Sequence, residues 1–506
     1  MRKKLLITFA ILLTTTLTGC GNTPDPTPCE TLLPKRVEEY REDPHPDYPT
    51  PADEPSPEII IQPDFPTQEE PTPEDPDPWG TAQYLHLSSI PLNIAAGFFA
   101  ELDQLHTRDG GQLWGVYLHT PFIFVDPGSR DIVANQPDPY GILTKAGDVY
   151  IGTLPYYLAP LYTAWLNFGG QTWAMKPWHM VAGNTRESRL RGMSHLAFHN
   201  LQPTLFGEFI GSDNSHLDEK EAGILLLLEV NALLNAFNSL NNIRDAINMG
   251  RISDALSIRA RRRQIFGRAY YENRHEIVEG TAQYTEYVLN VRNRAEVRQE
   301  LYGFARGLVY SPTLMHPFGY VTGALYAFLL DETGIPWRCQ VTASTDLAQL
   351  LKEALEITEL PPFDEINLLV YGYLYITRHL TERHETRQRM VEEVMDTFTT
   401  GPVLRISGGG NVFFSGHAFP LQEWGELARM FRGRVESQCY FGSVVVFNGD
   451  LIICSNGITI LATGIQIEEN RAFGDNWEVT LNDGFEIIAD GDNFAVINLL
   501  CEEPQG

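Results

Sequence analysis

The chain has 506 residues, of which 43% are hydrophobic and 20% are charged. This is enough apolar sequence for a large buried core and for two or three domains. The net charge of −28 at pH 7 excludes a nucleic-acid partner, because affinity for a phosphate backbone depends on lysine and arginine. One basic run, residues 259–263 with Arg268, is predicted to lie on a solvated helix face, with a lipid-headgroup contact as the alternative.

The first twenty residues have the pattern of an export signal. Arg2, Lys3 and Lys4 precede an apolar stretch, residues 5–17, that is shorter than the roughly 20 residues of a membrane-spanning helix. Leu17-Thr18-Gly19-Cys20 then resembles the lipobox of bacterial lipoproteins. The resemblance implies cleavage before Cys20, lipidation of its thiol, and a mature net charge of −28 − 3 = −31. An ordinary secretory signal with a chance cysteine is the alternative.

Lipidation implies a cell-envelope location outside the cytoplasm, with the membrane as a partner through the lipid. Gly21 is compatible with the outer membrane of a Gram-negative cell. With Cys20 lipidated, an odd number of cysteines remains, so they cannot all pair internally. These cysteines are Cys29, Cys339, Cys439, Cys454 and Cys501.

Composition divides the chain into four segments. Residues 1–19 are the signal peptide, and residues 20–80 form a tether rich in proline and acidic residues, which has too little apolar area to fold. Residues 81–400 form the main domain, and residues 401–506 form a small β-rich domain.

The main domain is predicted to open with an antiparallel sheet and to continue with helices. Its strands are expected at 114–118, 122–125, 149–151 and 172–175. A helix over 187–201 is expected to end at Pro203. Further helices are expected at 219–240, 252–263, 270–292, 321–330 and 347–355. Beyond Leu404 strands return, with hairpin signals at Asn448-Gly449, Asn456-Gly457 and Asp483-Gly484.

His195 and His199 carry the main chemical signal. They are four residues apart on the predicted 187–201 helix, so both imidazoles project from one face and can hold one zinc ion. Gln202 extends this polar stripe by a turn. A bare pair at this spacing also occurs by accident on solvated helices.

The surrounding motifs resemble those of bacterial gluzincin-type (zincin-like) metallopeptidases, which carry HExFHxxQ and EGxAxYxE. The resemblance covers roughly residues 113–337. The matching segments are Arg186-Glu187-Ser188-Arg189-Leu190, His195-Leu196-Ala197-Phe198-His199-Asn200-Leu201-Gln202, Asn214-Ser215-His216-Leu217-Asp218, the helix around Glu229, Glu279-Gly280-Thr281-Ala282-Gln283-Tyr284-Thr285-Glu286-Tyr287 and Phe318-Gly319-Tyr320-Val321-Thr322-Gly323-Ala324-Leu325-Tyr326.

The resemblance implies one zinc ion bound by His195, His199 and Glu279. The alternative to a ligand role for Glu279 is an ordinary solvent-exposed position on a helix. Gly280 favours the ligand role, since glycine inside a helix costs about 1 kcal/mol and usually marks close packing against another element.

One departure limits the implied activity. The motif has glutamate after the first histidine, where it acts as the general base, and this chain has Leu196. Glu276 is a candidate substitute base, although an exposed position is favoured for it, and His275 is a candidate polar group near the metal. Tyr284 and Glu286 are candidates to donate to an oxyanion or to brace a ligand, or else are ordinary packing and solvent residues.

The predicted fold is α+β, with an N-terminal sheet, a helical zincin-like core whose two-histidine helix lies beneath the sheet, and a C-terminal β-rich domain. The predicted function is a membrane-anchored lipoprotein resembling a zinc metallopeptidase, metal-binding but catalytically impaired, with a peptide or protein ligand. The alternative is a surface interaction lipoprotein that binds no metal.

Overall fold

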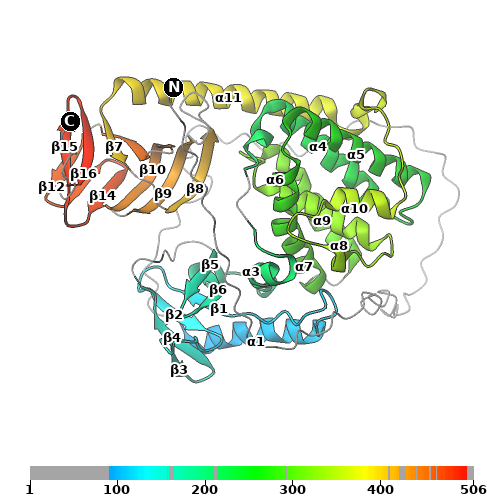
Figure 1. Ribbon diagram of the computed structural model, residues 1–506, viewed down its shortest axis with the longest axis horizontal. Coiled ribbons are helices and arrows are strands. Elements are labelled where there is room, and N and C mark those ends of the chain that lie inside the picture. Colours follow the sequence, from blue (N-terminus) through cyan, green and yellow to red (C-terminus); the bar gives the residue numbers. More distant parts are fainter. Residues whose placement is uncertain are drawn as a thin grey trace, which may run out of the picture.

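The chain folds as a mixed α+β protein with an N-terminal sheet, a helical core and a C-terminal β-rich region (Figure 1). The predicted signal peptide, Cys20 and the tether lie outside the described residues. The computed structural model describes residues 90–155, 158, 164–209, 213–290, 293–407, 411–420, 429–439, 441–454, 457–462 and 464–498.

The N-terminal sheet has six strands in the order β3-β4-β2-β1-β6-β5. Strands β1 and β6 are parallel and the other neighbours are antiparallel, so the sheet is mixed and the prediction of an antiparallel sheet is wrong for this one pair. Phe122 and Phe124 pack toward the helical core, while Ile123 and Val125 pack into a second cluster on the opposite face. The strands are β1 Phe122–Val125, β2 Asp131–Ala134, β3 Thr144–Ala146, β4 Val149–Thr153, β5 Ala164–Phe168 and β6 Gln171–Pro177.

The strands predicted at 122–125, 149–151 and 172–175 are confirmed. The strand predicted at 114–118 is wrong, because this segment is a turn with positive φ at Gly111 and Gly115. Trp114 is buried there, and its indole Nε1 donates to the Thr285 hydroxyl at 2.8 Å. The turn serves to anchor the start of the domain on the helical core.

Helix α1, Leu92–Asp109, runs beside the small sheet and contacts α3 and β4. No helix was predicted here from the sequence. Its buried residues Ala95, Phe99, Leu102 and Leu105 follow helical spacing, so this apolar face closes one side of the sheet.

The helical core is built around two largely buried helices, α4 and α9. Its α-helices are α2 His179–Ala182, α3 Arg186–Phe206, α4 Lys220–Asn238, α5 Ala246–Phe266, α6 Ala269–His275, α7 Thr281–Asn290, α8 Arg294–Gly307, α9 Pro317–Asp331, α10 Leu347–Ala354 and α11 Tyr373–Thr400. A π-helix spans Glu276–Gly280, and 3-10 turns span Ser215–Asp218, Leu308–Tyr310, Trp337–Gln340, Phe363–Glu365 and Leu368–Tyr371.

Two predicted helix boundaries need correction. Helix α3 passes through Pro203 and ends at Phe206, since proline removes one helical hydrogen bond without obliging the last turn to unwind. The helix predicted over 270–292 is in fact α6, the π-helix and α7 in succession.

Two arginines of the basic run, Arg259 and Arg262, are buried, so the predicted solvated position is wrong for them, whereas Arg261 is exposed. Arg259 and Arg262 are 2% and 0% exposed. Glu229 of α4 lies between them, 2.9 Å from Arg259 Nη1. Arg259 also pairs with Glu276, and Arg262 pairs with Glu272. Opposite charges from four consecutive elements of the core offset the cost of burying each one.

Among the described helices, α4 alone has the length and apolarity of a membrane span. Most of that stretch is buried inside the protein, and it carries Glu229 in the ion-pair cluster. These are the properties of a core helix.

The C-terminal region contains strands paired around β10, and its first strand begins near the predicted boundary at 401. Strands β10 and β11 pair up to Cys454 and Gly457, which confirms the hairpin predicted there, although Asn456 lies outside the described residues. The other two signals do not mark hairpins: Asn448-Gly449 lies at a register shift within β10, and the strands on either side of Asp483-Gly484, β14 and β15, do not pair with each other. The strands are β7 Val403–Ser407, β8 Asn411–Pro420, β9 Arg429–Cys439, β10 Gly442–Cys454, β11 Gly457–Leu461, β12 Gln466–Glu468, β13 Arg471–Gly474, β14 Trp477–Leu481, β15 Phe485–Asp490 and β16 Asn493–Asn498.

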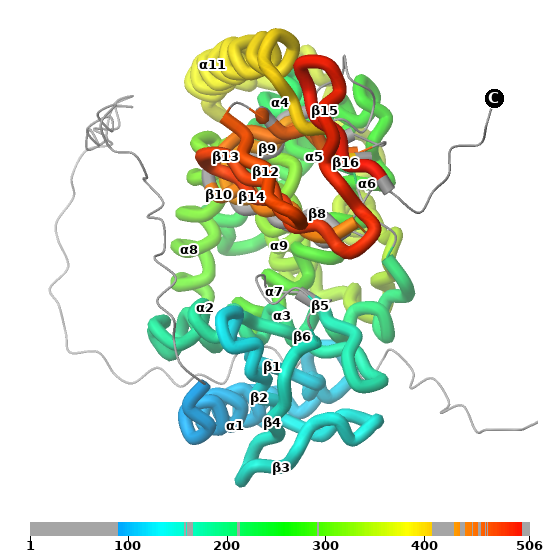
Figure 2. Tube along the Cα trace, turned by 90° about the vertical axis from the view of Figure 1, so that its left-hand side faces the viewer, coloured from blue at the N-terminus to red at the C-terminus, as the bar shows by residue number. Residues whose placement is uncertain are grey.

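Helix α11 joins the helical core to the β-rich region. Ile376 and Leu380, near its start, are buried in the core cluster, whereas Val394 and Phe398, near its end, pack with Met430 of β9. Figure 2 shows α11 above the β-rich strands, with α1 and the small sheet at the opposite end of the molecule.

Candidate metal centre

Helix α3 carries both histidines and begins with a side-chain cap. The Thr185 hydroxyl accepts a hydrogen bond from the Ser188 backbone N–H, which satisfies one of the free amides of the first turn. The helix contacts β6 of the sheet and α7, as expected for a two-histidine helix beneath the sheet. Met193 and Ala197 face the core, leaving His195 and His199 on the face toward α7 and the π-helix.

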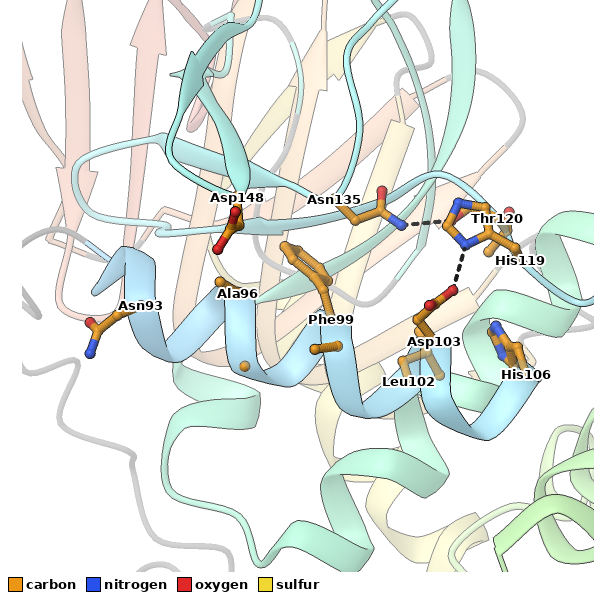
Figure 3. Close-up of a pocket in the computed structure, with 12 residues that line it drawn as sticks. Asn93, Ala96, Phe99, Leu102, Asp103, His106, His119, Thr120, Asn135 and Asp148 are labelled. Carbon is orange, nitrogen blue, oxygen red and sulfur yellow. Dashed lines mark hydrogen bonds and ion pairs between the residues drawn. The ribbon is translucent and has the colours of Figure 1, made fainter. Parts of the chain in front are cut away.

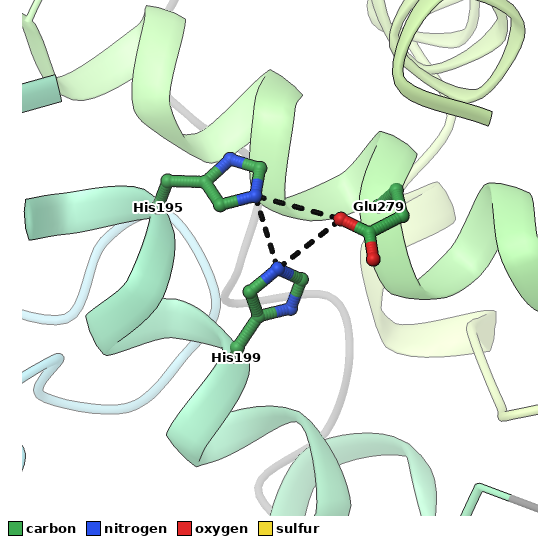
Figure 4. A group of neighbouring side chains, drawn as sticks. All are labelled: His195, His199 and Glu279. Atoms are coloured by element: carbon green, nitrogen blue, oxygen red, sulfur yellow. Dashed lines mark hydrogen bonds and ion pairs between the residues drawn. The ribbon is translucent and has the colours of Figure 1, made fainter. Parts of the chain in front are cut away.

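The structure brings His195, His199 and Glu279 together (Figure 4). The two Nε2 atoms are 3.0 Å apart, and Glu279 Oε2 lies 3.6 Å from His195 Nε2 and 3.3 Å from His199 Nε2. Ligands about 2.0–2.1 Å from a tetrahedral zinc ion stand about 3.3 Å from one another. The buried Glu279 Oε2 has no hydrogen-bond partner. The three donor atoms therefore fit one ion of zinc size.

Glu279 reaches the histidines from a π-helix, Glu276–Gly280. Such short π segments are frequent at functional sites because they shift side chains relative to a regular helix. A Cβ added to Gly280 would lie 2.4 Å from the Gly323 Cα atom of α9. The close packing predicted from Gly280 is thus confirmed, and it presses the glutamate-bearing turn against α9.

Neighbouring side chains fix the orientation of both imidazoles. His199 Nδ1 is 2.8 Å from Gln202 Oε1, and the Gln202 amide donates to the Val278 carbonyl at 2.7 Å. Because the Gln202 oxygen accepts, His199 Nδ1 carries the proton and Nε2 presents a lone pair. Glu286 Oε2 lies 3.2 Å from His195 Nδ1 and favours the same tautomer there. The bracing role considered for Glu286 agrees with this contact.

The protonation states fit a site made for a cation. Burial alone would lower the pKa of His195, but its close contacts with the Glu279 and Glu286 carboxylates outweigh burial and raise the pKa to about 9. Burial would raise the pKa of Glu279, yet its contacts with the two histidines hold that pKa well below the usual range. Two carboxylates thus flank the histidines, and without a metal a proton on His195 offsets part of their charge.

Lys176 of β6 is a further charged group beside Glu286. Burial lowers the pKa of Lys176, and the Glu286 carboxylate partly opposes that shift. Its ammonium group lies against α3 at Gly192, where an added Cβ would be 2.5 Å from Nζ. Glu286 therefore lies in the electrostatic field of both the histidine it braces and a lysine from the sheet.

Two aromatic side chains border the site. Trp165 of the edge strand β5 is 47% exposed, and its ring centroid is 5.8 Å from that of His199. Tyr320 of α9 stacks on His195 at 5.5 Å, and burial together with the Glu279 carboxylate raises the pKa of its phenol. Trp165 was not predicted as a site residue. The signal was the apolar alternation in residues 164–168 before Gly169-Gly170, whose positive φ angles suit a hairpin turn.

The other candidates lie outside the three-residue cluster. Leu196 is 2% exposed and belongs to the apolar core. Glu276 is 0% exposed, so the favoured exposed position is wrong, and Arg259 and Thr322 bind its carboxylate. This engagement leaves Glu276 unsuited to act as a base. His275 donates from Nε2 to the His316 carbonyl at 2.7 Å. Tyr284 is buried among aromatic rings and donates to Asp331 at 2.8 Å, in agreement with a packing role.

A separate cavity of about 650 Å³ lies between α1 and the sheet (Figure 3). Asp103, His106, His119 and Asp148 contribute its titratable side chains. His106 is buried, and its Nε2 has no hydrogen-bond partner. Burial, with a smaller effect of His119, lowers the pKa of His106 to about 4, so its ring is neutral at pH 7.

Comparison with protein family models, curated proteins and solved structures finds no match to this chain.

Proposed function

We propose that this chain is an extracytoplasmic lipoprotein, anchored through Cys20, whose zincin-like body binds one zinc ion and has weak or no peptidase activity. One observation carries the proposal: His195, His199 and Glu279 present three donor atoms 3.0–3.6 Å apart, with Gln202 and Glu286 orienting the two imidazoles. Two histidines and one glutamate are the zinc ligands of thermolysin-type sites, which leave a fourth position for water or substrate.

The residues of this chain can supply the zinc ligands of a peptidase but not its general base. A bound zinc ion lowers the pKa of its water and polarises a carbonyl. The proton of that water needs an acceptor, and Leu196 offers none. Glu276, the substitute considered from sequence, is held by Arg259. A positioned base typically contributes 10²- to 10⁴-fold to the rate, so we expect turnover to be lower by roughly that factor than in a site with glutamate.

A peptide ligand fits the edge of the sheet next to the site. Strand β5 pairs with β6 on one side and is the last strand of the sheet on the other. An extended peptide can add to such an edge through main-chain hydrogen bonds. Trp165, on this strand and beside His199, supplies an apolar surface for a side chain of that peptide.

The proposed location agrees with one feature of the body. Cys339 is disulfide-bonded, and disulfides persist in oxidising compartments outside the cytoplasm. The lipid anchor itself is proposed from the resemblance of Leu17-Thr18-Gly19-Cys20 to a lipobox.

The test is the zinc content of the purified mature chain, measured by elemental analysis after incubation with zinc and removal of the excess. We expect about one zinc per chain, with loss in both His195→Ala and Glu279→Ala. His119→Ala is the control, since this histidine is not part of the three-residue cluster and its side chain is 41% exposed. Circular dichroism verifies that each variant is folded.

The absence of zinc from the unmodified chain would contradict the metal centre and would favour the alternative of an interaction lipoprotein without metal.

A further inference from the structure

Four exposed apolar residues gather where the 3-10 turn Leu368–Tyr371 meets the start of α11. Leu369, Val370, Tyr373 and Leu374 are 61%, 59%, 36% and 70% exposed, and we call them the α11 patch. Isolated exposed leucines are normal on a protein surface, whereas adjacent ones mark a site of contact. The patch therefore needs an explanation beyond the fold.

The α11 patch is held outward by a well-anchored turn. Tyr371 is buried, donates from its hydroxyl to Asp254 at 2.6 Å, and accepts at its carbonyl from the Asn231 amide at 2.9 Å. Gly372 then adopts φ +81, which suits glycine and reverses the chain into α11. With Tyr371 fixed on one side and Ile376 buried on the other, Leu369 and Leu374 cannot turn inward.

Tyrosines and an arginine border the α11 patch. Tyr310 is 65% exposed, and its hydroxyl contacts that of Tyr375. The Arg378 guanidinium lies 6.0 Å from the Tyr375 ring centroid. Leu374 and Arg378 are four residues apart and both exposed, so they share a helix face. Glu382 follows one turn later, and this face thus changes from apolar to basic to acidic along α11.

This order of side chains matches the depth profile of a membrane surface. Leucines favour the acyl region, tyrosines the level of the headgroups, and arginines the lipid phosphates. In a strongly acidic chain, an exposed cation is needed to contact the phosphate of an anionic lipid, and Arg378 supplies it on this face. Asp364 and Glu365 are exposed in the preceding 3-10 turn.

We propose that the α11 patch is a second membrane contact, which inserts into the surface of a bilayer containing anionic lipid. The proposal rests on the proposed lipid anchor in one respect. A chain tethered to the bilayer meets it at an effective concentration in the millimolar range, so a small patch suffices to orient the body.

The test uses the mature chain from Gly21, made without lipid, so that binding through the anchor does not mask the patch. Sedimentation with vesicles of phosphatidylcholine and phosphatidylglycerol measures partitioning, at lipid concentrations extended into the millimolar range that the tether would supply, with pure phosphatidylcholine vesicles for comparison. We expect binding to the anionic vesicles, a loss of at least about tenfold in the double variant Leu369→Asp, Leu374→Asp, and a smaller loss in Arg378→Gln.

Ile247→Asp is the matched control, because Ile247 of α5 is an apolar residue with 68% exposure outside the patch. Three results would overturn the proposal: no binding by the unmodified chain, an equal loss in the Ile247 variant, or light scattering that shows a dimer dissociated by the double variant. The last would make the patch a protein interface. Zinc content and lipidation of Cys20 are measured separately, so a failure here is distinct from a failure of the proposed function.

Discussion

Glu286 shows how one residue outside the ligand set controls the candidate metal centre. Its carboxylate lies 3.2 Å from His195 Nδ1, on the side of the ring opposite the ligand atom. A carboxylate so placed fixes the tautomer of a ligating histidine and increases the electron density at its other nitrogen. Glu286 is therefore a positioning residue for His195.

Replacing Glu286 with glutamine should weaken zinc binding by roughly 10- to 100-fold while the fold is retained. Competition with a chromophoric chelator measures the Kd. Glu187→Gln is the control, because Glu187 lies on the same helix as His195 and pairs with Arg191 at the surface. Equal affinities for the Glu286 variant and the unmodified chain would show that this carboxylate does not orient the ligand.

Residue spacing predicted the two histidines of the site but not the residues that come from other elements. The i, i+4 separation of His195 and His199 is a local property, so the sequence alone placed both rings on one face. Glu279 was reached through the resemblance of its motif, and the nearness of this residue to the histidines depends on how α3 meets the π-helix. Trp165 comes from a strand edge whose position relative to α3 no local pattern specifies.

At the scale of elements, the close approach of the π-helix and α9 decides where Glu279 stands. Gly280 meets Gly323 of α9 with no room for a side chain between them. The two elements can pack at this distance because both positions lack a Cβ.

Gly280→Ala should therefore push the two elements apart, lower the free energy of unfolding by about 1–3 kcal/mol, and weaken zinc binding. Thermal unfolding and zinc content measure both effects. Gly303→Ala in α8 serves as the control, since an added Cβ there meets nothing within 4 Å. That variant should keep its zinc and gain up to about 1 kcal/mol from better helix propensity. An unfolded Gly280 variant would leave the packing argument intact, whereas a stable, zinc-loaded one would contradict it.

Helix prediction was most accurate for segments with strong apolar periodicity and failed where tertiary contacts decide. Helix α4 was located to within two residues because most of its residues are apolar. The basic run on α5 was expected in solvent because arginines seldom lie in a core. Its acidic partners come from three other elements and are Glu229, Glu272 and Glu276. They cannot be identified from the sequence of α5 alone.

At the scale of the whole molecule, this buried ion-pair cluster unites the core. Glu229 and Glu276 come from α4 and the π-helix, and Arg259 of α5 contacts both. Tyr326 of α9 donates to Glu229 at 2.7 Å. The cluster thus holds the turn that carries Glu279 in a fixed relation to the helices behind it.

Arg259→Ala should destabilise the protein by about 3–5 kcal/mol, because it leaves two buried carboxylates without this partner. Denaturant unfolding at pH 7 measures the loss. Arg261→Ala, on the exposed side of the same helix, should change stability by about 0.5 kcal/mol or less. Similar values for the two variants would mean that water or another cation takes the place of Arg259.

Because the single helix α11 contacts both the helical core and the β-rich region, it restricts which insertions and deletions the gene can accept. The first part of α11 contacts the helical core as far as Arg387, which lies beside Asp218. Three residues later, Met390 already packs toward the strands of the β-rich region. Inserting one residue between them would turn everything beyond by about 100° and advance it by about 1.5 Å. Val394 and Phe398 would then face water. Insertions and deletions should accordingly be excluded from this short stretch among homologous genes, while the same changes in surface loops are tolerated.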